Sequence, residues 1–275
     1  MNSPAISVIL PFFNAEKTLN KALSSISGQT LSNFECLLID NISEDQSREI
    51  ARRWTLYDSR FLLLTEKRQG VAFASNTGSK HSRAQYIARM DADDVAYPER
   101  LKKQAYFLDR YQEYGAVAGL AKYINHTGEK NGFRKYVEWN NSVVTHEELL
   151  KNRFIDSPVI NPTAMWRKNA EQKAGGCIHG DFPEDYEMWL RWLDKGMKID
   201  KVNEYVLLWN DLSDRLTRND PRYSSDAFYE TKSKYLANEL NRINPHHSEI
   251  MVWGASRIMR RRSEKLIKHG IKIKA

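Results

Sequence analysis

The chain has 275 residues, of which 41% are hydrophobic and 28% charged, a balance typical of a folded enzyme and not of a disordered chain. Only two cysteines occur, Cys36 and Cys177, so a disulfide framework is not expected and a reducing cytoplasm fits. The formal net charge of +7 is carried by residues 242–275, where nine Lys or Arg oppose two Asp or Glu. Residues 1–241 are therefore neutral overall, and we predict no nucleic-acid partner.

Strand-like and helix-like segments alternate through the first 100 residues. The apolar run at 5–13 is too short to cross a bilayer and no basic segment precedes it, so we do not interpret it as a signal peptide. The predicted strands are 6–10, 35–39, 61–64 and 85–90. The predicted helices are one capped by Asn14 and ended by Gly28, one opened by a Ser43–Gln46 capping box, and one at about 71–82. This alternation predicts an α/β domain with a parallel sheet covered on both faces.

The pattern is less regular after residue 100. We predict strands at 116–120 and 163–166 and a loop or edge hairpin at 125–142. We predict helices around 101–108, after a Thr145–Glu148 capping box, and at 184–195 closed by Gly196. We divide the chain into a domain at 1–241, with a nucleotide-binding half (1–100) and an acceptor half (101–241), and a basic C-terminal segment at 242–275.

Three carboxylates follow the fourth predicted strand in "YIARMDADDVAYPERL", namely Asp91, Asp93 and Asp94. Ligands of parallel sheets bind at the carboxyl ends of the strands, where Asn14 and Asp40 are also expected. Carboxylates this close repel one another, and a divalent cation would compensate them. Mg²⁺ or Mn²⁺ held by such oxygen ligands usually completes its shell with substrate phosphates and water.

Three other interpretations of this motif are considered. The first is a solvated acidic turn, with Asp94 or Glu99 capping the next helix, and the motif alone supports this turn about as well as it supports a metal site. An EF-hand is excluded because Ala96 and Lys102 occupy the positions that require Gly and Glu. A haloacid dehalogenase-like phosphatase would use Asp91 and Asp93, although its nucleophile normally follows the first strand of the domain.

A second acidic pair, Glu184 and Asp185, opens the predicted helix in "GDFPEDYEMWLRWLDKG". Acidic residues in a first helical turn stabilise the helix dipole, and on spacing alone this interpretation is favoured. A carboxylate at the end of an element in a cleft can also act as a general base toward a hydroxyl.

Five motifs in order together resemble the inverting family 2 glycosyltransferases, over most of residues 5–215. They are "SVILPFFNAEKTLNKALSSISGQT", "FECLLIDNISEDQS", "RQGVAFASNTG", "YIARMDADDVAYPERL" and "PEDYEMWLRW". The resemblance implies the GT-A fold, a Rossmann-like nucleotide-sugar-binding α/β fold with a mostly parallel central sheet flanked by helices.

The resemblance also implies roles for individual residues. Those implied to bind the nucleotide sugar are Pro11, Phe12, Asn14, Glu16, Asp40, Arg68, Gly70, Asn76 and Asp91. Asp93, together with Asp91, is implied to hold Mn²⁺ or Mg²⁺. Asp185 is implied to be the catalytic base, with Glu184 beside it.

One departure from the family pattern lies in "LLWNDLSDRLTRNDPRYS" (207–224), where many relatives carry Arg-x-His and this chain has no histidine. A metal ligand from this loop would have to be Asp211 or Asp214. Arg215 or Arg218 would instead balance phosphate charge.

The implied activity is metal-dependent, inverting transfer of a sugar from a nucleotide-diphosphate sugar, with UDP the expected nucleotide. The expected acceptor is a glycan or lipid-linked glycan in cell-surface polysaccharide or glycolipid biosynthesis, and the expected location is the cytoplasm or the inner face of the membrane. A non-catalytic nucleotide-sugar binding module is the remaining alternative.

The basic segment in "SEIMVWGASRIMRRRSEKLIKHGIKIKA" predicts a strand at 250–253, a turn at 254–256, a basic helix to about Lys268 and a second strand after Gly270. This order resembles the first βα unit of a Rossmann-like domain, which suggests the truncated start of a second domain. Alternatively, Arg260, Arg261 and Arg262 belong to an amphipathic helix that makes peripheral contact with anionic lipid. The sequence does not indicate the oligomeric state.

Overall fold

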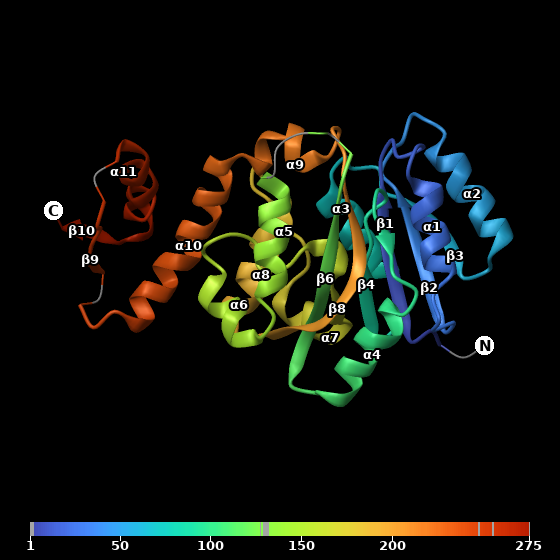
Figure 1. Cartoon of the computed structure of the whole chain (residues 1–275), viewed down its shortest axis with the longest axis horizontal. Coiled ribbons are helices and arrows are strands. Elements are labelled where there is room, and N and C mark those ends of the chain that lie inside the picture. Colours follow the sequence, from blue (N-terminus) through green and yellow to red (C-terminus); the bar gives the residue numbers. More distant parts are fainter. Residues whose placement is uncertain (1–2, 127, 129–131, 247, 255, 275) are drawn as a thin grey trace.

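The computed structural model describes residues 3–126, 128, 132–246, 248–254 and 256–274. One mixed sheet of eight strands crosses the molecule in the order β3-β2-β1-β4-β7-β6-β8-β5, with helices on both of its faces (Figure 1). Its strands are β1 (Ile6–Phe12), β2 (Phe34–Asp40), β3 (Phe61–Thr65), β4 (Tyr86–Arg89), β5 (Val95–Ala96), β6 (Tyr114–Asn125), β7 (Met165–Arg167) and β8 (Lys198–Asp211). The strand pairs β3–β2, β2–β1, β1–β4 and β6–β8 are parallel, which confirms the predicted mostly parallel sheet.

The helices of the first half agree with the predicted alternation. They are α1 (Leu19–Ser27), α2 (Ser47–Tyr57) and α3 (Val71–His81), and α4 (Arg100–Arg110), predicted around 101–108, opens the second half. β1 continues two residues beyond its predicted end, through Pro11. Its pairing with β4 ends at Ile9, so no N–H is required of Pro11 on that side of the strand.

The two predicted helix caps in this half are wrong. α1 begins at Leu19, and Asn14 instead has a positive φ of 47° and joins two loops: its backbone N–H donates to Ser43 Oγ (3.2 Å) and its Oδ1 accepts from the Glu44 N–H (2.9 Å). α2 begins at Ser47 without a side-chain cap. These polar side chains therefore connect the loops after β1 and β2, because each finds a partner across the loops and not within its own helix.

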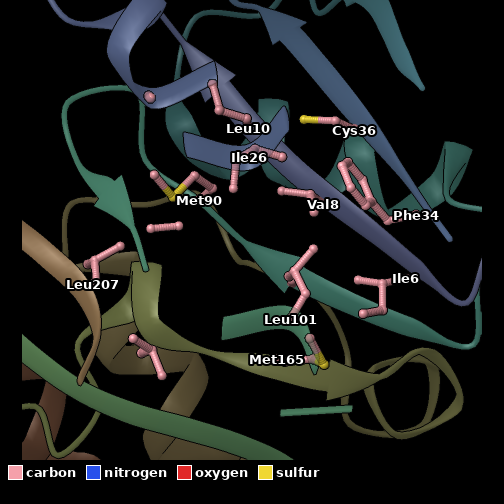
Figure 2. Packing of buried hydrophobic residues seen from close by; sticks show 14 of the residues in the cluster. Ile6, Val8, Leu10, Ile26, Phe34, Cys36, Met90, Leu101, Met165 and Leu207 are labelled. Carbon is pink, nitrogen blue, oxygen red and sulfur yellow. The ribbon is translucent and has the colours of Figure 1, made fainter. Parts of the chain in front are cut away.

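Alternating residues of β1 supply the two hydrophobic cores on opposite faces of the sheet. Ile6, Val8 and Leu10 pack with α1 residues such as Ile26, as Figure 2 shows, whereas Ile9 belongs to the cluster on the other face that contains Trp189. Successive side chains of a strand point to opposite faces, so a continuous apolar strand requires cover on both sides.

The second half contains one helix that was predicted to be a loop or hairpin. α5 (Gly132–Ser142) covers β6, and the side chain of Asn141 donates to the Ala121 carbonyl (2.8 Å) and accepts from the Ala121 N–H (3.0 Å). The polar composition of this segment concealed it, because several of its polar side chains satisfy backbone groups elsewhere in the fold: Asn141 those of Ala121 on β6, and Tyr136 and Asn140 the carbonyl of Ser157. The remaining helices here are α6 (His146–Asn152), α7 (Lys168–Ala174), α8 (Glu184–Asp194), α9 (Leu216–Asn219) and α10 (Ser225–Ile243), with single 3₁₀ turns at Asn161–Thr163 and Pro221–Tyr223. The predicted Thr145–Glu148 capping box of α6 is confirmed.

The C-terminal residues form a small unit at the far end of α10 (Figure 1). β9 (Glu249–Met251) and β10 (Lys272–Lys274) pair in parallel, joined by α11 (Arg257–Glu264) and a 3₁₀ turn at Ile267–His269. Leu266 and Ile271 are buried against Ala237 of α10. The predicted strand–helix–strand order is thus present. Among the described residues, none of the helices has the length and hydrophobicity needed to span a membrane.

Candidate active site

A cleft of about 1440 Å³ opens at the carboxyl ends of β1 and β4. Its walls include α5, α8, the end of β8, α10, the segment 155–162 and one residue of α11. Nine of the twelve residues to which the resemblance gives a role line it: Pro11, Phe12, Asn14, Glu16, Gly70, Asp91, Asp93, Glu184 and Asp185. The convergence expected from the topology of a parallel sheet is therefore present for Asn14, Asp91 and Asp93, whereas Asp40 does not line the cleft.

The other three implied nucleotide-sugar residues do not line the cleft and instead shape its loops. Asp40 is 2% exposed and pairs with Arg48 (2.7 Å). Arg68 pairs with Glu66 (2.9 Å). Asn76 on α3 binds both backbone groups of Cys177, at 2.8 and 3.0 Å. Their direct contact with a nucleotide sugar stays a prediction.

Two arginines compensate the three carboxylates of the acidic motif. Arg89 Nε donates to Asp91 Oδ1 at 2.9 Å. Arg215 Nη1 lies 3.0 Å from Asp93 Oδ2 and 3.3 Å from Asp94 Oδ1. Burial raises the pKa of both Asp93 and Asp94, neighbouring carboxylates raise it further, and Arg215 opposes the shift.

Asp94 differs from the other two carboxylates because it is fully buried. Its Oδ1 accepts from the Asn210 N–H (2.9 Å), which ties the motif to the end of β8. Neither Asp94 nor Glu99 caps α4 through its side chain, so the interpretation of the motif as a helix-capping turn is wrong. Asp94 therefore positions the loop that carries Asp91 and Asp93.

The acidic motif fits a divalent cation. One carboxylate oxygen from each of Asp91, Asp93 and Asp94 lies within 4.8 Å of the others. Within the described residues, Asp94 Oδ2 is buried without a hydrogen-bond partner. Oxygen-only donors of this charge suit Mg²⁺ or Mn²⁺, and the two cleft-lining residues, Asp91 and Asp93, are placed to hold the ion.

The first turn of α8 brings Glu184 and Asp185 into the same cleft. Glu184 Oε2 accepts from the Tyr223 hydroxyl (2.6 Å), and Asp185 Oδ1 accepts from the Tyr186 N–H (2.7 Å). Burial, followed by the charge of Glu184, raises the pKa of Asp185 to about 7. A carboxylate with a pKa near neutrality in a cleft has the proton affinity expected of a general base.

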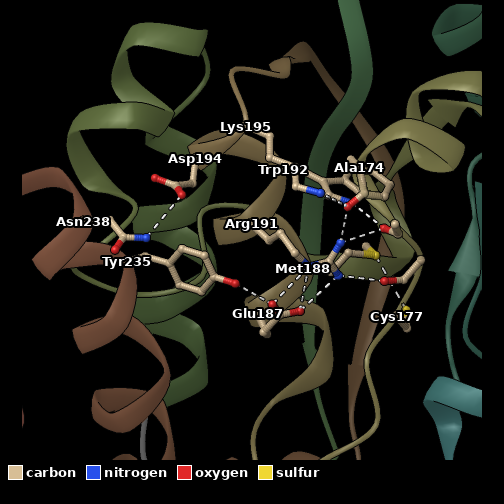
Figure 3. Close-up of polar contacts among 12 residues, drawn as sticks. Ala174, Cys177, Glu187, Met188, Arg191, Trp192, Asp194, Lys195, Tyr235 and Asn238 are labelled. Carbon is tan, nitrogen blue, oxygen red and sulfur yellow. Dashed lines mark hydrogen bonds and ion pairs between the residues drawn. The ribbon is translucent and has the colours of Figure 1, made fainter. Parts of the chain in front are cut away.

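The middle of α8 is fixed by a network around Arg191, which Figure 3 shows together with its partners. Arg191 pairs with Glu187 (3.0 Å) and donates to the carbonyls of Ala174, Gly175 and Gly176 at 2.6–2.8 Å. The hydroxyl of Tyr235 on α10 donates to Glu187. The orientation of Glu184 and Asp185 thus depends on contacts that α8 makes one and two turns further along.

Replacing Arg191 with methionine is expected to lower the free energy of unfolding by about 3–5 kcal/mol, because it leaves Glu187 as a buried charge without its partner. Urea denaturation monitored by circular dichroism measures this change. Arg52→Met, which breaks the exposed Arg52–Glu49 pair on α2, is the control and should leave the denaturation midpoint unchanged. Equal midpoints for the two variants would contradict the anchoring role of Arg191.

The end of β8 and the loop after it line the cleft with all four residues considered for metal or phosphate, namely Asp211, Asp214, Arg215 and Arg218, and their roles stay predictions. Arg215 is bound to Asp93 and Asp94, and its guanidinium lies 4.1 Å above the Trp209 ring. Asp211 is held by Arg218 (2.8 Å) and by the Tyr123 hydroxyl (2.7 Å), so both of its oxygens have hydrogen-bond partners. Asp214 lines the cleft.

Several cleft residues had no recognised signal in the sequence. Tyr223 reaches Glu184 across 39 positions, and nothing in its neighbourhood marks it. The pairing of Arg89 with Asp91 could have been predicted, because a basic residue two positions before an aspartate at a strand end can pair with that aspartate. The other cleft residues without an assignment from the sequence that are used below are Asp156, Phe228, Tyr229 and Lys232, and Arg262 was assigned only to the lipid-contacting helix.

The position of the acidic motif argues against the phosphatase alternative. Asp91 follows β4, the fourth strand of the sheet in chain order, whereas a dehalogenase-like nucleophile is expected after the first.

A family model, curated relatives and solved structures all match this chain to glycosyltransferases. Residues 7–175 match Glycosyl transferase family 2. The chain is 30% identical over 232 residues to the putative glycosyltransferase EpsE of Bacillus subtilis, covering 82% of this chain and 80% of that protein. It is 30% identical over 211 residues to the Escherichia coli UDP-Glc:alpha-D-GlcNAc-diphosphoundecaprenol beta-1,3-glucosyltransferase WfgD, covering 74% and 75%. The structure of S. aureus TarS 1–349 in complex with UDP-GlcNAc superposes with a TM-score of 0.66 at 18% identity, covering 96% of this chain and 71% of that one, and shows the same GT-A fold. The chain therefore belongs to glycosyl transferase family 2 and is a nucleotide-sugar glycosyltransferase.

Proposed function

We propose that this protein transfers a sugar from a UDP-linked donor to a hydroxyl of a lipid-linked glycan, with inversion at the anomeric carbon and with Mn²⁺ or Mg²⁺ bound. The observation that carries the proposal is the presence, in one cleft, of the Asp91–Asp93 oxygen pair and of Asp185 with a pKa near 7. Inverting transfer requires one charge-neutralising group on the donor side and one base on the acceptor side.

On the donor side, a divalent ion held by Asp91 and Asp93 would neutralise the diphosphate leaving group. Arg89 and Arg215 hold these two carboxylates in place.

Gly70 lines the cleft at φ 137°, and a Cβ at this position would approach the His179 ring to 3.3 Å. Glycine thus permits a backbone conformation here that other residues rarely adopt. Pro11 and Phe12, at the end of β1, offer an apolar surface to the nucleotide base.

On the acceptor side, Asp185 accepts the proton of the attacking hydroxyl. The hydroxyl oxygen then attacks the anomeric carbon from the face opposite the departing diphosphate, which inverts the configuration. Glu184 accepts a hydrogen bond from the Tyr223 hydroxyl. Because this carboxylate is already engaged, Asp185 is the one that takes the proton. The assignment of UDP and of a lipid-linked acceptor is supported by the donor bound to TarS and by the donor and acceptor named for WfgD.

Incubation with UDP-, GDP- and dTDP-sugars in the presence and absence of EDTA tests the proposal. Transfer to a lipid-linked glycan, or slow metal-dependent donor hydrolysis, supports it. Binding of a donor without any turnover would instead support a non-catalytic module, and release of phosphate from simple monoesters would support a phosphatase.

We also propose that the C-terminal unit contacts the inner, anionic face of a membrane. Large apolar side chains are exposed there: Trp253 is 100% exposed, Met251 82% and Ile258 62%. Arg257 and Arg260 are exposed on α11, the helix that also carries Ile258. Basic residues attract anionic headgroups, while indole rings favour the interface between headgroups and acyl chains.

Arg260→Gln is expected to weaken binding to vesicles that contain phosphatidylglycerol by about fivefold, because each surface cation contributes about 1 kcal/mol of attraction. Vesicle sedimentation at low and high salt measures this, and Trp253→Ala should also weaken binding. Tyr57→Ala, which removes an aromatic ring that is 80% exposed on α2, is the control. Wild-type binding that is absent, or unaffected by salt and by both C-terminal substitutions, would contradict the membrane contact.

A further inference from the structure

Two cations meet on one aromatic ring in the wall of the cleft formed by α10 and α11. Lys232 Nζ lies 4.0 Å from the centroid of the Tyr229 ring, and Arg262 Cζ lies at the same distance from it. All three side chains line the cleft, although Arg262 belongs to the C-terminal unit and the other two belong to α10.

Neither cation has a carboxylate within ion-pair distance among the residues that the structure describes. Lys232 is 6% exposed and donates to the Ile155 carbonyl (2.9 Å). Asp156 is the carboxylate that acts most strongly on it, from beyond ion-pair distance. Buried or half-buried cations usually have an anionic partner, and a ring face compensates only part of the charge.

Neighbouring cations of the same wall do have such partners. Arg222 pairs with Asp220 (2.6 Å), and Arg261 and Lys265 pair with Asp226 (3.4 and 3.1 Å). Among the described residues, Lys232 and Arg262 are the basic residues of α10 and α11 that line the cleft, and neither has such a partner.

The two cations lie toward the acceptor end of the cleft. Phe228, the neighbour of Tyr229 on α10, stacks on the ring of Tyr186, which directly follows Asp185, with ring centroids 5.3 Å apart. The segment that accepts from Lys232 at the Ile155 carbonyl also accepts from the Tyr186 hydroxyl at the Arg153 carbonyl (2.6 Å). A donor diphosphate held at Asp91 and Asp93 would thus leave Lys232 and Arg262 without an anion.

We propose that Lys232, Tyr229 and Arg262 bind a phosphate or diphosphate ester carried by the acceptor. This inference rests on the proposed transfer to a lipid-linked acceptor and adds the residues of this chain that bind the phosphate of such an acceptor. Two uncompensated cations match a group with two or more negative charges, and the planar guanidinium suits phosphate oxygens in particular. Phe228 and Ile155, which line the cleft beside them, provide apolar surface for the aglycone next to the phosphate.

Calorimetric titration with geranyl diphosphate in EDTA tests the site without a sugar or a metal. We expect the wild-type chain to bind it, and Arg262→Gln and Lys232→Met each to weaken binding at least about tenfold, as loss of a charged hydrogen-bond donor to an anion does. Arg260→Gln, the same change on the same helix outside the cleft, should leave this affinity within twofold. Asp93→Ala should retain it, because the donor diphosphate site is separate.

Four results would overturn the inference: no binding by the wild-type chain, equal loss in Arg260→Gln and Arg262→Gln, loss in Asp93→Ala, or equally tight binding of the carboxylate analogue geranic acid. Vesicle binding separates headgroup phosphate from acceptor phosphate, since Arg260→Gln should weaken it more than Arg262→Gln does. Should Lys232→Met fail to fold, Arg262→Gln carries the test, because Arg262 is partly exposed.

The inference and the proposed activity fail in different ways. Mn²⁺-dependent UDP binding and transfer to an acceptor with a neutral aglycone should be unchanged in Arg262→Gln. If the wild-type chain binds and turns over no sugar nucleotide, the proposed function fails whatever geranyl diphosphate does. If it does turn them over, but the ratio of the KM values for phosphorylated and neutral acceptors is the same in Arg262→Gln as in wild type, only the anion site fails.

Discussion

Replacing Asp185 with asparagine is expected to lower the rate of sugar transfer by about 10²- to 10⁴-fold, the usual contribution of general-base catalysis, and to leave donor affinity unchanged. Asparagine keeps the shape of the side chain and its acceptor oxygen toward the Tyr186 N–H but cannot take a proton from the acceptor. Single-turnover kinetics and calorimetric donor titration separate the two effects. Asp181→Asn, which alters an exposed carboxylate lining the same cleft, is the control and should change the rate only slightly.

The pH dependence supplies a second readout for the same variant. Because burial and Glu184 raise the pKa of Asp185 to about 7, wild-type kcat/KM should rise with pH up to about 7 and then level off, and the residual activity of the variant should lack this rise. When folding raises the pKa of a carboxyl group, that group lowers the free energy of unfolding of the protein as pH increases from the ordinary carboxyl pKa near 4 to the raised value of about 7. The variant should therefore gain thermal stability relative to wild type as pH rises through that window.

The opposite pattern would favour the helix-dipole interpretation of Asp185. A variant that melts earlier at neutral pH but keeps its turnover would show that the carboxylate stabilises α8 and takes no proton. Glu184→Gln would then be the next substitution to measure.

Asp93→Ala is expected to abolish the metal-dependent part of donor binding. The change removes one of the two cleft-lining carboxylates placed to hold the ion. Without metal, the free energy of unfolding should hold or rise, because repulsion with Asp91 and Asp94 is relieved. Arg215 would still bond to Asp94 (3.3 Å) and to the Asn210 carbonyl (2.6 Å).

Calorimetry of a UDP-sugar with and without Mn²⁺ measures this effect, and urea denaturation of the metal-free variant measures the stability. Asp214→Ala is the matched control, since Asp214 lines the same cleft and was the alternative ligand from the loop after β8. Unchanged Mn²⁺-dependent affinity in Asp93→Ala, with loss in Asp214→Ala, would transfer the ligand role to Asp214.

The elements of the first half were predictable because each depends on local patterns. β1 and β2 are buried along their whole lengths and read as continuous apolar runs, and the stripe of Leu19, Ala22, Leu23 and Ile26 marks the buried face of α1. The meeting of Asp91, Asp93 and Asn14 followed from parallel topology, which places all carboxyl ends of neighbouring strands at one edge. Asp185 joined them only through the family resemblance, because its spacing alone favoured a stabilised helix end.

The predictions that failed depended on partners distant in the sequence. Asn14 and Ser43 have the chemistry of helix caps, but they bond to each other across the two loops, because a polar side chain takes whichever partner the fold brings nearest. α5 was hidden by polar residues such as Asn141, whose side chain bonds to β6 and not to water.

The sequence by itself determined the α/β class, the strand-end acidic motif and the first-turn carboxylates, because local periodicity and covalent spacing encode them. Only the tertiary structure decided what each carboxylate does. It buried Asp94 against β8, placed Arg89 and Arg215 beside the other two, and raised the pKa of Asp185 by removing it from water beside Glu184. It also brought Arg262 from α11 to the ring that Lys232 shares. Burial and electrostatic interactions depend on distances between elements far apart in the chain, and those distances are established only when the sheet and its helices have packed.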